Sequence, residues 1–156
     1  MIKKILIAGA MAASAAFLVP QASAQTFSPT GPFTLANVGT FTVSKGITLN
    51  CSLAGSGSVD ASGNASVTSL TLSGGLCGSI AFTTTPYVVS GVSPSTVTIN
   101  GMVVTAITGN CAGNLTGSYN QSTGIITFAG ATLPATSGLG ACRITGQVKI
   151  SPTLTF

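Results

Sequence analysis

The sequence predicts an all-β fold: a single antiparallel domain, either a β-sandwich or a Greek-key barrel, of about eight to ten strands. Three observations support this prediction. Apolar and polar residues alternate with a period of two along much of the chain. Glycine or proline interrupts nearly every candidate helix, and β-branched residues are frequent. Segments of strand character recur about every ten residues, with turn residues between them.

The first 24 residues are predicted to be a secretory signal peptide and not part of the fold. A basic start, MIKK, precedes an apolar run from 5 to 19, and the small residues ASA at 22–24 resemble a cleavage site. The apolar run is too short for a membrane span, which needs roughly 20 residues. We therefore expect an exported bacterial protein whose mature part, 25–156, is one all-β domain without a transmembrane span.

The N-terminal part of the mature chain contains two predicted strands. TFTVS at 40–44 has its Phe and Val on one face, and ITLNCSL at 47–53 alternates with Ile, Leu, Cys and Leu inward. The preceding segment, 25–33, is expected to be an extended and loose terminus. A donor segment that pairs with another subunit is the alternative.

The remaining strands are predicted in the same way. Residues 65–73 form a hairpin with 47–53, and 95–107 is long enough that it should bend at Asn100-Gly101. RITGQVKI at 143–150 alternates, with Ile, Val and Ile on one side, and SPTLTF continues extended to the last residue. Three shorter strands are predicted at 86–90, 114–119 and 125–129.

Four cysteines, Cys51, Cys77, Cys111 and Cys142, are expected to form two disulfides, because an exported chain enters an oxidising compartment. Three connectivities are possible. We favour Cys51–Cys77 with Cys111–Cys142, since each pair brackets a predicted hairpin. A metal site is a poor alternative because the chain has no His and no CxxC pair. No metal and no cofactor is predicted.

Two similar turns are predicted between strands. Asp60, the one acidic residue of the chain, begins DASGN, and Asn120 begins NQSTG. In each, the first side chain can accept hydrogen bonds from backbone N–H groups just ahead of it. Gly63 and Gly124 can take the positive φ that closes a hairpin. All four are therefore predicted to be turn residues; calcium binding by Asp60 is a weaker alternative, because calcium sites collect several oxygens.

This composition predicts no catalytic residues. General acid–base catalysis commonly uses His, Glu or Asp, and one turn Asp cannot form a carboxylate pair. Without His there is no Ser-His-Asp or Cys-His arrangement. Lys45 and Lys149 could serve Ser-Lys chemistry, but we expect both on strands among outward, soluble neighbours. We therefore expect a protein that is not an enzyme.

The mature surface is expected to be nearly neutral, because its charged side chains are only Lys45, Asp60, Arg143 and Lys149. Little charge means little repulsion between copies and few charged residues on strand edges. We expect association with itself through strand edges, or with apolar interfaces such as oil droplets or the cell surface. A well-hydrated monomer is the alternative. Three scattered cations predict no nucleic-acid partner.

Four segments together resemble a known family: LNCSLAGSGSV, GGLCGSIAF, NLTGSYNQSTGIITFAGATLP and CRITGQVKISPTLTF. From about residue 33 to residue 156 the chain resembles small exported bacterial proteins known as activators of alkane oxidation. The resemblance implies an extracellular, cell-surface or periplasmic protein that promotes alkane oxidation or uptake, with no catalytic motif, through interfacial activity. The alternative hypothesis is a self-associating subunit of an extracellular fibre or biofilm matrix.

Overall fold

A computed structural model describes residues 25–156, and the predicted signal peptide lies outside these residues. The described chain consists of nine strands and one short 3-10 turn, η1. In chain order the elements are β1 (Gly31–Lys45), β2 (Ile47–Val59), β3 (Ala65–Ser73), η1 (Gly75–Ser79), β4 (Ala81–Thr83), β5 (Tyr87–Ser93), β6 (Thr96–Thr105), β7 (Cys111–Asn120), β8 (Ile125–Leu133) and β9 (Cys142–Ser151).

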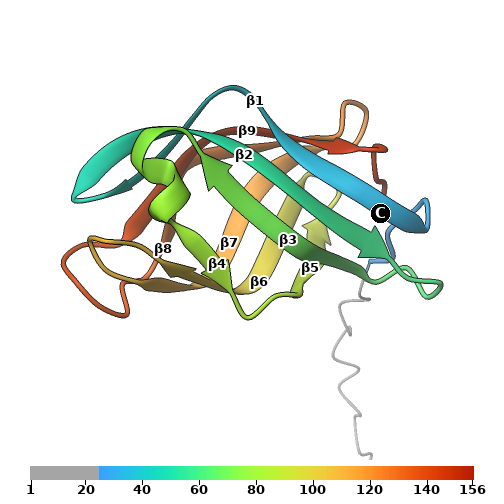
Figure 1. Cartoon of the computed structure of the whole chain (residues 1–156). Helices are drawn as coiled ribbons and strands as arrows, with labels where there is room; N and C mark the ends of the chain where they lie inside the picture. The colour runs from blue at the N-terminus through green and yellow to red at the C-terminus, as the bar shows by residue number, and fades with distance from the viewer. Residues whose placement is uncertain (1–24) are drawn as a thin grey trace, which may run out of the picture.

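The nine strands form one sheet that closes into a barrel (Figure 1). β1 pairs with β2 on one side and with β9 on the other, which closes the sheet. The short strands β4 and β5 share one position between β3 and β6. Around the barrel the strands follow chain order and pair antiparallel, an up-and-down arrangement. The all-β class and a closed barrel are confirmed, and the sandwich alternative is wrong. The strands follow chain order, which differs from the Greek-key order of the predicted barrel.

Bulges explain why the sheet closes instead of splitting into two layers. Register shifts interrupt the pairing of β1 with β9, of β6 with β7 and of β8 with β9. Each bulge bends its strand and increases the local twist, so a long sheet can coil until its first and last strands meet. The predicted bend at Asn100-Gly101 falls at the β6 bulge, between Ile99 and Met102.

Most predicted strands coincide with observed ones. β3 has the predicted bounds, and β9 extends the predicted strand by one residue at each end. β1 is longer than predicted, because it begins at Gly31 instead of at residue 40. β4 and η1 were not predicted; both are short, and η1 lies in a glycine-rich stretch that gives no periodic signal.

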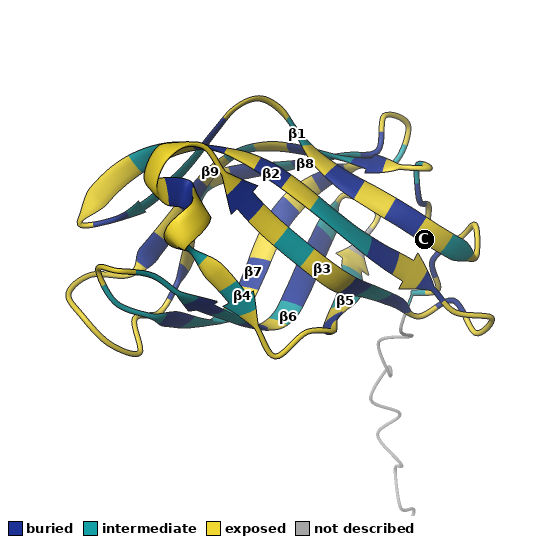
Figure 2. Cartoon of the chain, viewed as in Figure 1, coloured by how far each residue is buried: buried dark blue, intermediate teal, exposed yellow. Residues whose placement is uncertain are grey.

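The barrel interior is the apolar core. Buried and exposed residues alternate along the strands in Figure 2, as expected where every second side chain points inward. In β1, Phe33, Leu35 and Phe41 are buried, and in β9 Ile144 and Val148 are buried. The outward positions are mostly Thr, Ser and Asn, so the exterior wall is polar but almost uncharged.

The two ends of the described chain lie together at one end of the barrel, to the right in Figure 1. Ser28 pairs with Thr155, and the Phe27 ring lies 4.8 Å from the Phe156 ring. The Phe27 side chain is buried, and such burial contributes roughly 1.5–3 kcal/mol. The expectation of a loose terminus is therefore wrong for this segment. We call this end the closed end.

The Tyr119 hydroxyl joins the C-terminal segment to the closed end. It donates to the Leu154 carbonyl at 2.6 Å and accepts from the Leu154 N–H at 3.1 Å. Tyr119→Phe leaves this buried donor and acceptor without partners, and each lost partner costs about 1–3 kcal/mol. We expect the free energy of unfolding, measured by urea denaturation at pH 7, to fall by roughly 2–4 kcal/mol.

A matched control for Tyr119→Phe is Thr34→Val, which removes an exposed hydroxyl that donates to the Ser151 carbonyl. Because the exposed Ser151 carbonyl can accept a hydrogen bond from water instead, we expect the free energy of unfolding to change by less than about 0.5 kcal/mol. Equal effects of the two substitutions would contradict the role assigned to the Tyr119 hydroxyl.

Candidate functional site

The described residues offer no cluster of metal ligands. Between residues 25 and 156, no group of three His, Cys, Asp or Glu side chains lies close enough to hold a metal ion. In the same part of the chain, no helix has both the length and the apolar character needed to cross a membrane.

The Asp60 carboxylate is engaged entirely within its own turn, at the closed end. One oxygen accepts from the backbone N–H groups of Ser62 and Asn64, at 2.8 and 2.9 Å, and the other accepts from the Asn64 side-chain amide at 2.9 Å. Gly63 has φ +82° and donates to the Asp60 carbonyl. The carboxylate therefore stabilises the β2–β3 hairpin.

Asn120 has the equivalent place in the β7–β8 turn. Its side-chain oxygen accepts from the Ser122 N–H at 3.0 Å and from the Ser122 hydroxyl at 2.7 Å. Gly124 has φ +70°, and its N–H donates to the Asn120 carbonyl. Asp60 and Asn120 thus make the same kind of turn, one with a charge and one without.

The few titratable groups predict a stability that hardly depends on pH between about 5 and 9. The Asn64 side-chain amide, followed by the Asn64 and Ser62 N–H groups, lowers the pKa of Asp60. Its contribution is therefore present above an unfolded pKa of about 3.9 and is lost as pH falls below it. Burial raises the pKa of Tyr87 and of Tyr119. Their contribution is present below about pH 10 and is lost as pH rises further.

Urea denaturation at pH 5, 7 and 9 measures this directly. We expect free energies of unfolding that agree within roughly 0.5 kcal/mol, because the one side chain that ordinarily titrates in this range, His, is absent from the chain. A change of more than about 1 kcal/mol across this range would mean that unfolding is linked to proton binding by a group other than Asp60, Tyr87 and Tyr119.

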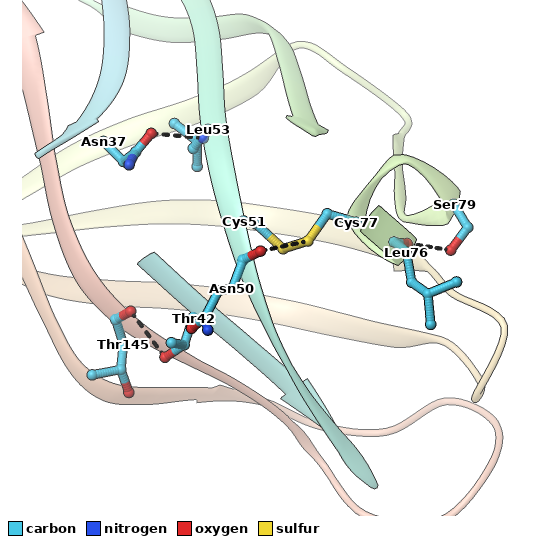
Figure 3. The surroundings of a disulfide bond; sticks show 9 residues. All are labelled: Asn37, Thr42, Asn50, Cys51, Leu53, Leu76, Cys77, Ser79 and Thr145. Atoms are coloured by element: carbon cyan, nitrogen blue, oxygen red, sulfur yellow. Dashed lines mark hydrogen bonds between the residues drawn. A yellow bond between two sulfur atoms is a disulfide. The ribbon is translucent and has the colours of Figure 1, made fainter. Parts of the chain in front are cut away.

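Both disulfides lie toward the opposite end of the barrel, which we call the open end. Cys51 in β2 is bonded to Cys77 in η1, and Cys111, the first residue of β7, is bonded to Cys142, the first residue of β9. Figure 3 shows the first bond joining η1 to β2. η1 and the strand ends at this end of the barrel are thereby fixed in place.

The two long loops of the open end are also fixed to each other. They are the β6–β7 loop, 106–110, and the β8–β9 loop, 134–141. The Asn110 N–H donates to the Ser137 hydroxyl at 2.9 Å, and the Thr136 N–H donates to the Asn110 carbonyl at 2.9 Å. Disulfides and hydrogen bonds therefore hold the loops and strand ends of the open end together.

A cavity of about 110 Å³ lies at the open end. Its walls are mainly apolar side chains from β1, β2, β3, η1, β4, β6, β8 and β9. A second apolar cavity of about 40 Å³ lies deeper in the barrel. Val43, Phe82 and Ile144 line both, so the two cavities are neighbours in the apolar interior of the barrel, which we call the lumen.

Four large apolar side chains surround the open end and are themselves exposed: Ile47, Leu76, Ile107 and Leu139. We call them the apolar rim. Their exposed fractions are between 46% and 92%, and the first three also line the cavity. The sequence predicts Ile47 inward, and its side chain does line the cavity, but it stays 46% exposed because Ile47 directly follows the Gly46 turn at the edge of the barrel. Leu139 lies in the β8–β9 loop.

Lys45 corrects a second expectation. Its side chain is only 5% exposed, lines the cavity and donates from Nζ to the Gly140 carbonyl at 2.7 Å. The sequence contains the signal, because Phe41, Val43 and Lys45 are two residues apart and share the inward face. Lys149, in contrast, lies toward the closed end and donates to the Thr123 carbonyl.

Chemically, this arrangement suits binding of apolar molecules better than bond-making. An apolar lumen, an apolar rim and one buried ammonium meet at the open end, whereas the Asp60 carboxylate lies at the closed end. The site residues predicted from the sequence all lie in turns or disulfides. Neither the rim nor the lumen has a signal in the sequence, because both depend on which loops meet when the barrel closes.

Comparison with known proteins identifies the family. A family model described as alkane oxidation protein activator PraA/PraB-like matches residues 1–156, so the chain belongs to this family. No curated protein and no solved structure gives a significant match.

Proposed function

We propose that this member of the alkane oxidation activator family is an exported, non-enzymatic protein that promotes alkane oxidation or uptake by direct contact with hydrocarbon. The apolar rim at the open end is the contact surface. One observation supports this most strongly. Among the seven large apolar side chains that are exposed in the described residues, four surround the mouth of the apolar lumen.

The rim has the physical properties that adsorption to oil requires. Burying one large aliphatic side chain contributes about 1.5–3 kcal/mol, so a few of them can hold a small protein at an oil surface. The disulfides and the loop hydrogen bonds already fix the rim, so little ordering entropy opposes contact. The nearly uncharged exterior adds little repulsion between neighbouring molecules at the surface.

Export and the absence of catalysis are part of the same proposal. Two disulfides suit an oxidising compartment outside the cytoplasm, whether periplasmic, cell-surface or extracellular. The family description names an activator, and the one carboxylate side chain is engaged in a turn.

The alternative of a fibre or biofilm subunit receives less support from the fold. Strand addition between subunits needs an unpaired strand edge. β1, β2 and β9 are each paired on both sides, and closing the sheet into a barrel leaves only short unpaired stretches, as where β7 meets β8. The N-terminal segment, proposed as a donor, is docked on its own barrel through Ser28 and Thr155.

Growth experiments test the proposed function. A strain lacking this gene receives the purified mature protein, with hexadecane or with acetate as the sole carbon source. We expect the protein to shorten the lag on hexadecane and to leave growth on acetate unchanged, because only hexadecane forms a separate apolar phase. An equal effect on both carbon sources, or no effect on hexadecane, would contradict the proposal.

A further inference from the structure

We propose that the lumen of the open end binds a single-chain carboxylate, with the alkyl chain among the apolar walls and the carboxylate on Lys45. The ligand class is therefore a fatty carboxylate, as opposed to an alkane alone. This inference rests on the proposed function, because oxidation of the terminal carbon of an alkane yields a fatty carboxylate. It adds a ligand and a binding residue that contact with an oil surface does not require.

The first support is the incomplete bonding of the Lys45 ammonium. An ammonium has three donors, and Nζ donates to one partner among the described residues, the Gly140 carbonyl. The side chain is 5% exposed, and a buried charge is costly unless it is paired and hydrogen-bonded. The one acidic side chain of the chain, Asp60, follows β2, and β2 pairs with β1 so that Asp60 and Lys45 lie at opposite ends of the hairpin.

The second support is the position of the ammonium between the lumen and the loops. The Lys45 stem packs beside the β6–β7 loop, since a methyl group on Gly109 would lie 2.8 Å from Lys45 Cε. Its Nζ reaches the β8–β9 loop at Gly140. A carboxylate bound here would have its chain directed toward Val43, Phe82 and Ile144, where the lumen continues. The ammonium would therefore meet the charged head group of an amphiphile, and the apolar wall would meet its alkyl chain.

The shape of the site also distinguishes it from an ordinary packing defect. Cavities in protein cores are usually small and closed, and an apolar one is empty of water. This cavity of about 110 Å³ has exposed Ile47, Leu76 and Ile107 in its wall, so a ligand can enter from the open end. The same apolar rim that contacts oil would guide an alkyl chain into it.

Calorimetric titration of the mature protein with octanoate and with octan-1-ol at pH 8 tests the inference. The two ligands have the same chain, and only octanoate is charged. We expect octanoate to bind at least roughly tenfold more tightly, since a hydrogen bond to a charged group contributes that much. Equal affinities, or no binding of octanoate, would overturn the inference without the use of any variant.

Two lysine variants locate the site. Lys45→Met keeps the aliphatic volume and should weaken octanoate binding at least roughly tenfold, with octan-1-ol binding changed by less than about twofold. Lys149→Met removes the same charge far from the lumen and should change neither. An equal loss in both variants would overturn the assignment to Lys45. Unchanged octanoate binding in a folded Lys45→Met protein, as judged by circular dichroism, would do the same.

The results also separate this inference from the proposed function. If the protein shortens the lag on hexadecane but does not bind octanoate, the inference is wrong and the proposed function stands. If it binds octanoate through Lys45 but does not affect growth on hexadecane, the proposed function is wrong and the lumen site stands.

Discussion

Replacing Cys111 and Cys142 together by alanine is expected to lower the free energy of unfolding by about 3–4 kcal/mol. The bond joins residues 31 apart in the chain, and a closed loop of this length restricts the unfolded chain by that amount. For a domain of this size the melting temperature should fall by roughly 10–20 °C. Urea denaturation and thermal circular dichroism of the double variant and the wild type measure both quantities.

The second disulfide provides the comparison for this prediction. Cys51 and Cys77 are 26 residues apart, so their double alanine variant should lose a similar free energy, within about 1 kcal/mol. Losses below about 1 kcal/mol for both variants would contradict the role of the disulfides as the main covalent restraint on this almost uncharged domain.

Replacing two residues of the apolar rim, Ile107→Ser with Leu139→Ser, is expected to weaken adsorption to hexadecane on the order of 100-fold. Each side chain transferred from water to oil contributes about 1.5–3 kcal/mol, and serine contributes almost none. Both side chains are largely exposed, so stability should change by less than about 0.5 kcal/mol each. Drop tensiometry gives the protein concentration that half-maximally lowers the hexadecane–water interfacial tension.

Val88→Ser with Val92→Ser is the matched control for the rim variant. These valines are also exposed, at 59% and 68%, but they lie on β5, on the barrel wall, and do not line the lumen. We expect adsorption close to wild type. A similar loss in both double variants would mean that adsorption depends on total exposed apolar area, not on the open end.

The strands were the most predictable part of this protein. β3 and β9 follow directly from alternation, because a strand with one face on a core must place apolar residues at every second position. The turns at Asp60 and Asn120 were also predictable, since Asp, Asn and Gly at fixed places favour one local geometry.

Closure of the barrel could not be predicted in the same way. It depends on the pairing of β1 with β9, for example Leu35 with Ile150, which are distant in the sequence. Alternation assigns a residue to a face of a strand but does not name the neighbouring strand. A sandwich and a barrel therefore have the same pattern in the sequence.

The open end was missed for a related reason. Ile47 is the first residue of β2, whereas Leu76, Ile107 and Leu139 come from three different connections between strands. Only closure of the barrel brings these four segments together. Lys45 is different, because the period of two from Phe41 and Val43 already places it inward. Its charge favours an outward position, whereas its spacing from Phe41 and Val43 correctly indicates an inward one.

A polarity-sensitive fluorophore at each end of the barrel tests the central claim most directly. All four cysteines are bonded, so Ile107→Cys at the open end and Ser62→Cys at the closed end each introduce a single thiol for labelling. On addition of a hexadecane emulsion, we predict a blue shift of the emission for the label at 107 and no shift for the label at 62. Equal shifts at both positions, or a shift only at 62, would contradict contact through the open end.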